Sequence, residues 1–242
     1  MVMKACSALL LLASAAACAP IVTHGPRVEQ GITGYGTMGA GKSLCPPETC
    51  ETILVPQLGA GVRYGWAATD STLGFSAGFT YSAPVVSSEL DLYVQAPGSP
   101  LGLDAGAGVL AAGTHAMPYV QLGRMRPNGS GWYTTQGYAF LARRQIEIVL
   151  ADNYEQVEPR YWAPTVAYRT GGPYGMHFYV TGAFGTAWKY HPDEPGVRTG
   201  RQPVRTVMTG VVFDVRRAHP RRPAMSAPIP AVAPPPAAGQ PR

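Results

Sequence analysis

Charged residues and long apolar runs are both scarce in this sequence. Asp, Glu, Lys and Arg together make up 14% of the 242 residues. After residue 17, no apolar run approaches the ~20 residues that a membrane-spanning helix needs. The 29 glycines also disfavour helices, because a glycine inside a helix costs about 1 kcal/mol relative to alanine. These shortages exclude a bundle of membrane helices after the N-terminal segment and leave β-strands as the expected structure.

The N-terminus has the three parts of a secretory signal peptide. Lys4 supplies a positive charge, Ala5–Leu12 is apolar, and Ala13–Ala17 consists of small residues. We therefore expect residues 1–17 to be removed on export. Export would separate the mature protein from the cytoplasm and its nucleotides.

The end of this segment, Ala15-Ala16-Ala17-Cys18, resembles the lipobox of bacterial lipoproteins. In that family the cysteine receives a diacylglyceryl group and becomes the new N-terminus. The resemblance implies lipidation at Cys18, with palmitate-type acyl chains, followed by a linker over residues 18–27. Ordinary cleavage in the same alanine-rich stretch would instead leave Cys18 unmodified.

Two further cysteines, Cys45 and Cys50, bracket a short loop that begins with Pro46 and Pro47. An oxidising compartment would close this loop with a disulfide. The same prolines bear on the preceding stretch Gly36–Ser43, GTMGAGKS, which matches a phosphate-binding P-loop letter for letter. That motif requires a helix after the loop, and the two prolines prevent one. We therefore expect no bound nucleotide.

Side chains alternate between apolar and polar or small from residue 57 onward. In Leu58–Trp66 every even position is apolar and every odd position is glycine or charged. Similar alternation returns over residues 73–81, 90–95, 101–109, 176–189 and 207–216. Strict alternation is the signature of strands with one apolar face and one polar face.

From this pattern we predict an all-β fold of ten antiparallel strands, and eight or twelve strands are also compatible with it. The predicted strands cover residues 28–38, 52–67, 72–82, 88–96, 101–111, 115–125, 132–145, 160–170, 175–190 and 204–216. The pattern in 28–38 is weak, and Ile146–Leu150 would extend a strand or add one.

The polar face favours a membrane barrel over a soluble one. It consists of glycine, serine, threonine and a few charges, with little of the lysine and glutamate expected on a solvated surface. A transmembrane barrel turns its apolar face to lipid and its small or polar face to the lumen. Every second predicted connection is also short, as the periplasmic turns of bacterial barrels are. These short connections are Ala68–Ser71, Pro97–Pro100, Arg126–Gly131 and Gly171–Tyr174.

Residues 28–216 resemble a small outer-membrane β-barrel of Gram-negative bacteria, an up-and-down transmembrane barrel. Thr209–Val215 is similar to the C-terminal signal of that family, with a polar residue, a glycine and then hydrophobic residues at alternate positions. The resemblance implies a location in the outer membrane, contact with its lipid, and recognition by the barrel-assembly machinery. Barrels of this family commonly end there on an aromatic residue, whereas this chain continues.

The continuation, residues 217–242, is rich in proline, alanine and arginine and has no hydrophobic periodicity. We expect an extended or disordered periplasmic tail. It is basic, because no acidic residue follows Asp214. The tail is either inert or a contact for peptidoglycan or an envelope protein. Basic residues elsewhere are scattered, so we expect no nucleic-acid partner.

The inward face carries the candidate functional residues. We expect a polar network in the lumen, because a buried charge without a partner is costly. Its predicted members are Arg63, Asp91, Asp104, Arg143, His177, Lys189 and Asp214. No serine-hydrolase signature accompanies His115, and His191 with Asp193 is too small a set for a metal. We expect no enzymatic activity, no metal and no cofactor.

The sequence therefore indicates a structural scaffold or partner-binding component of the cell envelope. A narrow outer-membrane pore is the first alternative. A soluble periplasmic β-barrel lipoprotein that binds a ligand is the second.

Overall fold

The computed structural model describes residues 21–43, 54–68, 73–83, 87–96, 102–112, 115–141, 144–148, 153–172, 174–191, 194 and 197–218. The expected signal peptide, all four cysteines and most of the expected C-terminal tail lie outside these residues. The described part of the chain contains no helix that is long and apolar enough to cross a membrane.

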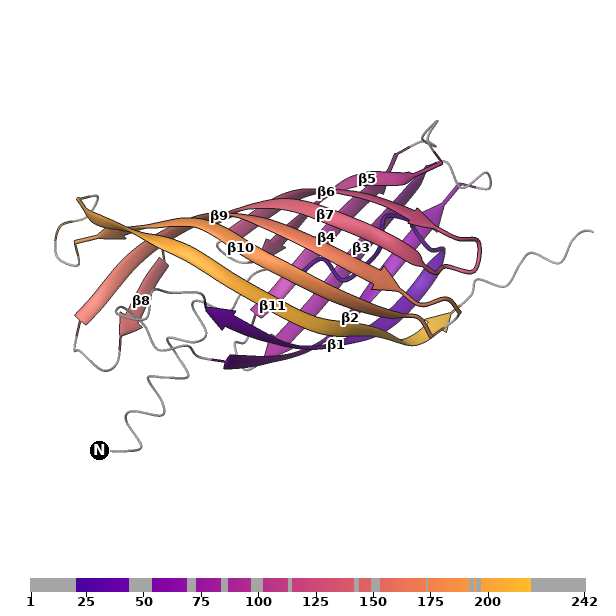
Figure 1. The fold of residues 1–242 in the computed structure, drawn as a ribbon, viewed down its shortest axis with the longest axis horizontal. Coiled ribbons are helices and arrows are strands. Elements are labelled where there is room, and N and C mark those ends of the chain that lie inside the picture. Colours follow the sequence, from indigo (N-terminus) through magenta and orange to yellow (C-terminus); the bar gives the residue numbers. More distant parts are fainter. Residues whose placement is uncertain are drawn as a thin grey trace, which may run out of the picture.

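Eleven strands make up the described fold (Figure 1). They are β1 (Gly31–Ser43), β2 (Leu54–Ala67), β3 (Gly74–Ala83), β4 (Ser87–Gln95), β5 (Asp104–Ala112), β6 (His115–Met125), β7 (Gly131–Leu141), β8 (Arg144–Ile148), β9 (Asn153–Arg169), β10 (Met176–Tyr190) and β11 (Arg198–Ala218). Ten of them correspond to the ten strands predicted from the alternation of side chains. The eleventh, β8, falls where the sequence indicated an extension or an additional strand.

The sheet closes into an antiparallel barrel of ten strands, which confirms the predicted fold class. β1 pairs with both β2 and β11, and β9 pairs with both β7 and β10. β8 remains outside the ring because it pairs only with Asn153–Val157 at the start of β9. The end of the barrel where β1 begins and β11 ends is called the turn end here, and the opposite end the loop end.

Tight connections join the strands at the turn end. Backbone hydrogen bonds close them between β2 and β3, β4 and β5, β6 and β7, and β9 and β10. In the β6–β7 turn, Asn128 accepts a hydrogen bond from the backbone of Ser130, and Gly129 has a φ of 81°. That left-handed conformation suits glycine, which has no Cβ to clash.

The strands are staggered by twelve residues around the barrel. A row of directly paired residues that starts at Gly31 passes from β2 around to β11 and returns to β1 at Ser43, twelve residues further along. A residue advances about 3.3 Å along a strand, and strands lie about 4.8 Å apart. Over ten strands this stagger tilts each strand about 40° from the barrel axis, within the range of transmembrane barrels.

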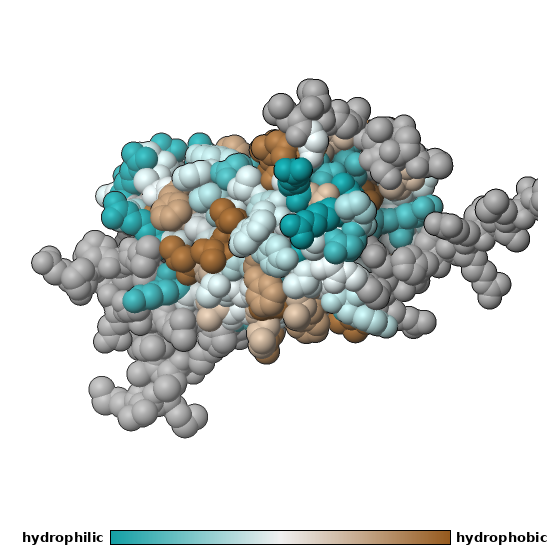
Figure 2. All heavy atoms as spheres, turned by 45° about the vertical axis from the view of Figure 1, so that its right-hand side comes forward, coloured by the Kyte–Doolittle hydropathy of each residue, from teal (hydrophilic) through white to brown (hydrophobic). Residues whose placement is uncertain are grey.

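Apolar side chains point outward and polar side chains inward. On β3 and β10, Phe79 and Val180 are about half exposed (47% and 53%), whereas the adjacent Thr80 and Thr181 are buried. A soluble barrel has the opposite arrangement, with its apolar side chains enclosed. In Figure 2, hydrophobic residues gather across the lower middle of the face shown, and hydrophilic residues lie to both sides of it.

Inward glycines make room for inward tyrosines. The stacked rings of Tyr93 on β4 and Tyr119 on β6 have centroids 6.0 Å apart. A Cβ on Gly106 would lie 2.0 Å from the Tyr93 hydroxyl oxygen, and one on Gly108 would lie 2.5 Å from that of Tyr119. These separations are too short for any side chain, so the β5 glycines let the two rings from the neighbouring strands lie over β5.

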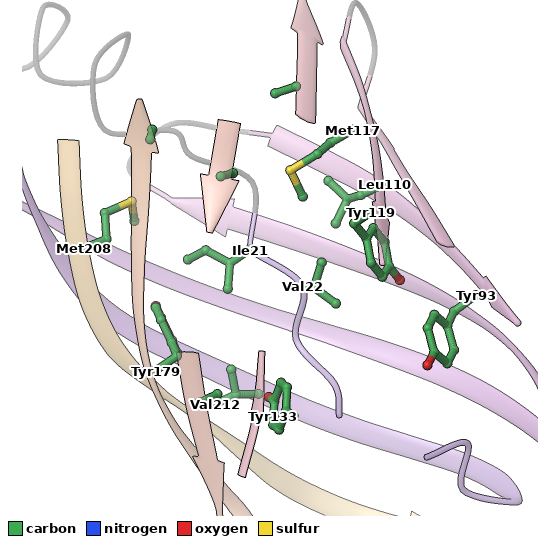
Figure 3. Close-up of a cluster of buried hydrophobic side chains, with 14 of the residues drawn as sticks. Ile21, Val22, Tyr93, Leu110, Met117, Tyr119, Tyr133, Tyr179, Met208 and Val212 are labelled. Carbon is green, nitrogen blue, oxygen red and sulfur yellow. The ribbon is translucent and has the colours of Figure 1, made fainter. Parts of the chain in front are cut away.

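The residues before β1 lie inside the barrel. We call Ile21–Gln30 the N-terminal plug, because most of it is buried among the inward side chains of the wall. Figure 3 shows Ile21 and Val22 in the barrel interior. The sequence had indicated a linker over 18–27 and a strand from residue 28. In the structure the strand begins at Gly31, whose φ of 100° turns the chain from the plug into β1.

Candidate functional site

The interior of the barrel centres on Asp91 of β4. Arg63 on β2 donates a hydrogen bond from Nη2 to Oδ2 of Asp91 at 2.8 Å. The Tyr119 hydroxyl donates to Oδ1 at 2.6 Å. The side chain of Asp91 is 2% exposed, so its charge is balanced by Arg63 almost without help from water.

Two plug residues complete this cluster. Nε2 of His24 lies 2.9 Å from the Tyr119 hydroxyl and 3.2 Å from Oδ2 of Asp91. Arg63 also donates from Nη2 to Oγ1 of Thr23 at 2.9 Å. Burial lowers the pKa of His24, and the charge of Arg63 lowers it further, whereas the neighbouring Asp91 opposes both effects.

A second ion pair joins the plug to β5. Arg27 donates from Nη2 to both carboxylate oxygens of Asp104, at 3.0 and 3.1 Å, and from Nε to Oδ1 at 3.1 Å. The backbone N–H of Met125 donates to the same carboxylate at 3.0 Å. Asp104 therefore links the plug to β6 as well as to its own strand.

A third ion pair lies near the turn end. Arg169 on β9 donates from Nη1 to the carboxylate of Glu29 in the plug and from Nη2 to Oδ2 of Asp214 on β11 at 3.0 Å. The Arg169 side chain is 6% exposed. One buried guanidinium thus holds the plug and the closing strand together.

Wall side chains also satisfy backbone groups of the plug. The Tyr93 hydroxyl donates to the carbonyl oxygen of Pro26 at 2.8 Å, and the Gln121 amide donates to that of His24 at 2.8 Å. The backbone N–H of Val28 donates to Oε1 of Gln95 at 2.8 Å. These bonds supply the partners that an extended segment without secondary structure needs when it is buried.

The structure brings some of the predicted lumen residues together and not others. Arg63 and Asp91 pair with each other, whereas Asp104 and Asp214 pair with arginines that the sequence reasoning did not single out. His177 is buried on β10, where Nδ1 lies 2.9 Å from the Tyr133 hydroxyl. Arg143 and the side chain of Lys189 lie outside the described residues.

Sequence reasoning missed His24, Arg27, Glu29 and Arg169. The first three precede the alternating pattern, so no face was assigned to them. Arg169 was detectable, because it continues the inward series of Ala163, Thr165 and Ala167 on β9. Every second residue of a strand points inward, so counting along β9 in steps of two assigns Arg169 to the lumen even though the alternation there is weak.

A small cavity lies beside the plug. A cavity of about 40 Å³ lies between the plug and the wall, bordered by residues that include Arg63, Arg169 and His177. A cavity of that size has room for only a few waters. Among the described residues, no group of three or more His, Cys, Asp or Glu is arranged to hold a metal ion.

The P-loop-like stretch Gly36–Ser43 lies entirely within β1. Its residues pair with β11 on one side and, as far as Lys42, with β2 on the other. A P-loop instead leaves backbone N–H groups free to surround phosphate. Lys42 is exposed near the loop end of β1.

No family model and no curated protein matches the chain. Among solved structures, the NanC porin is 11% identical with a TM-score of 0.37, covering 75% of this chain and 98% of its own. The β domain of the Bordetella autotransporter BrkA is 12% identical with a TM-score of 0.31, covering 78% and 100%. A triple mutant of the Rhodopseudomonas blastica porin is 10% identical with a TM-score of 0.21, covering 76% and 99%. At these TM-scores the likeness supports no conclusion about function.

Proposed function

We propose that this chain is an outer-membrane β-barrel of a Gram-negative envelope, held in the bilayer by its outward face. Apolar side chains occupy that face on strand after strand, and aromatic residues stand near both ends. Trp66 and Trp132 lie at the turn end, and Tyr81 and Phe140 lie toward the loop end, all about half exposed. Interfacial aromatic girdles of this kind flank the apolar band of transmembrane barrels. The turn end is then periplasmic.

We further propose that the barrel is a closed scaffold that presents its outer loops and its periplasmic end to envelope partners. The observation that carries this proposal is the N-terminal plug. Three charged residues of the wall bind the plug from separate strands, namely Arg63, Asp104 and Arg169. An open pore requires a continuous water-filled lumen, and the plug occupies that space.

Fractionation tests the membrane part of this proposal. We expect the protein to stay with outer membranes after carbonate and high-salt washes. We also expect it to migrate on SDS gels as a compact form that shifts on boiling. Release into the soluble fraction would support instead the soluble periplasmic barrel and would overturn the membrane assignment.

Planar-bilayer conductance tests the closed state. The purified wild-type barrel should give few discrete current steps at neutral pH, whereas a variant lacking residues 21–29 should give them often, because the plug no longer occupies the lumen. Steps of equal size and frequency from both proteins would favour the narrow pore. The boiling-dependent gel shift of the deletion variant is the control that its barrel has folded.

Other parts of the assignment rest on sequence alone. We propose recognition by the barrel-assembly machinery through Thr209–Val215, acylation at Cys18, and a peptidoglycan or protein contact made by the basic C-terminal tail. We propose no enzymatic role, because the lumen aspartates Asp91, Asp104 and Asp214 are each paired with an arginine.

A further inference from the structure

Basic side chains gather on the outward face of three strands near the loop end. Lys42 lies on β1, Arg205 on β11 and Arg160 on β9, and all three are exposed. Their outward direction follows from the pairing register. Arg205 pairs with Phe184, which is 39% exposed on the outer face, and Arg160 lies two residues from the outward Trp162.

The stagger of the barrel brings these residues to one height. The row of directly paired residues through Lys42 contains Val207 on β11 and Gly182 on β10. Because the strands are tilted, directly paired residues do not lie at the same height along the barrel axis. From β1 toward β11, β10 and β9, the position level with Lys42 moves about 1.2 residues per strand toward the loop end, relative to the directly paired residue. The horizontal line through Lys42 therefore passes within about one residue of Arg205, Phe184 and Arg160. Strands follow one another about every 6 Å along this line.

This height is the edge of the apolar band. On β1, Lys42 follows the outward residues Ile32 and Met38, which are 51% and 55% exposed. At a tilt of about 40°, the ten residue steps from Ile32 to Lys42 rise about 25 Å. The apolar band of transmembrane barrels is about 25 Å tall. The three cations thus lie where the acyl chains of the outer leaflet end and its headgroups begin.

A second tier of basic residues lies about 10 Å further out, four residues along β11 from Arg205. Arg201 and Arg198 flank the ring of Trp188, with guanidinium carbons 5.2 and 4.4 Å from its centroid. Stacking on the indole holds each guanidinium in place. Arg198 donates from Nε to the Tyr190 hydroxyl at 3.4 Å and Arg201 from Nη2 to Oγ1 of Thr186 at 3.2 Å, and their other N–H groups remain open to an acceptor.

Positive charge dominates this surface. Among the outward side chains that the structure describes on β9, β10, β11 and β1, Glu158 is the one carboxylate. It accepts hydrogen bonds from Arg160 at 2.6 and 3.0 Å and from the Tyr190 hydroxyl. The five basic residues are Lys42, Arg160, Arg198, Arg201 and Arg205. With one carboxylate they leave a net charge of +4, which faces the headgroup layer rather than the lumen.

From this arrangement we propose that the outward face of β9, β10, β11 and β1 binds the phosphate groups of an anionic lipid in the outer leaflet. Arginine suits this ligand, because its planar fork of donors matches phosphate oxygens in pairs. The acyl chains of the same lipid would lie on Phe184, Val180 and Phe178 below. The proposal rests on the outer-membrane assignment, and it names the class of lipid that the barrel recognises.

Lipid-binding measurements on the folded barrel test it. The protein, in an uncharged detergent, is titrated with diphosphorylated lipid A, with the same lipid after enzymatic dephosphorylation, and with inorganic phosphate. Bound lipid is counted by native mass spectrometry. We expect binding of the diphosphorylated lipid alone. Each variant is first checked for the boiling-dependent gel shift, so a failure of the barrel itself is seen separately.

Two arginines provide a matched comparison. Arg205→Gln should weaken binding about tenfold, the effect of losing one hydrogen bond to a charged group. Arg124→Gln should leave it unchanged, because Arg124 is an exposed arginine at the turn end of β6. The combined variant Lys42→Gln, Arg160→Gln, Arg205→Gln should abolish measurable binding.

Three results would overturn the proposal. They are equal binding of the phosphorylated and dephosphorylated lipids, binding of inorganic phosphate as tight as that of the lipid, and equal effects of the Arg205 and Arg124 variants. Basic residues that only reach toward the interface by their length would give the first result.

Discussion

Arg63 of β2 reaches Asp91 of β4 across Gly78, which stands between them in the register of β3. A Cβ on Gly78 would lie 3.1 Å from Nε and 3.2 Å from Nη2 of Arg63. A Cβ alone would make the guanidinium shift by a few tenths of an ångström, and a larger side chain would displace it further from Asp91.

Gly78→Val should break this pair. The valine would displace the guanidinium and leave Asp91 as a buried charge without its partner, which costs about 3 kcal/mol or more. We expect a lower urea midpoint for unfolding of the purified barrel in detergent. Gly34→Val is the control, because a Cβ there meets nothing within 4 Å. Equal midpoints for the two variants would show that Arg63 reaches Asp91 by another route.

The ion pair of Arg27 with Asp104 should hold the plug closed. Both side chains are partly exposed, at 36% and 14%, so the pair contributes about 1 kcal/mol or less. Arg27→Gln should raise the frequency of current steps in planar bilayers by up to about fivefold, and Asp104→Asn should do the same. The double variant should add little to either single change. Gln30→Ala, at an exposed plug position, serves as the control, and an unchanged step frequency in Arg27→Gln would contradict this role.

Acid should loosen the plug through His24. Its pKa is lowered in the docked state, so between about pH 6.5 and that lowered value the released plug binds a proton that the docked plug does not. Docking is therefore fully stable above pH 6.5 and weakens as the pH falls below it. Burial and the charge of Arg63 lower this pKa and Asp91 opposes them, while the Tyr119 hydroxyl and the Tyr93 ring also lie beside the imidazole.

The measurement is the step frequency of the wild type and of His24→Gln between pH 7.5 and pH 5. We expect the frequency to rise with acid in the wild type and to stay level in the variant. The same rise in both proteins would assign the effect to another titrating group.

Acylation at Cys18 has its own test. Intact-mass measurement of protein purified from the outer membrane should show an N-terminus at Cys18 carrying acyl chains. Cys18→Ser should reduce processing and delivery, while inserted molecules remain resistant to carbonate. A mature protein that begins elsewhere, or an unacylated Cys18, rejects the idea.

The strands of the barrel were predictable because each strand has one apolar face and one luminal face. Apolar and polar residues therefore alternate along the sequence, as at Phe79 and Thr80 or at Val180 and Thr181. The plug was not predictable from the sequence. Its residues show no period, and its partners are far away in sequence, as Val28 is from Gln95. Parity placed Asp104 and Asp214 inside the barrel, but it gave no information on which arginine would pair with each.

The position of the plug directly before β1 has a consequence for the order of assembly. The barrel closes where β1 meets β11, the first and last strands of the ring, and Arg169 binds both Glu29 of the plug and Asp214 of the closing strand. A chain that closed this seam with the plug outside would have to reopen the seam or thread the segment through a finished mouth. We therefore predict that the plug is enclosed as the ring closes. A molecule that leaves its assembly site by this route already contains its seal.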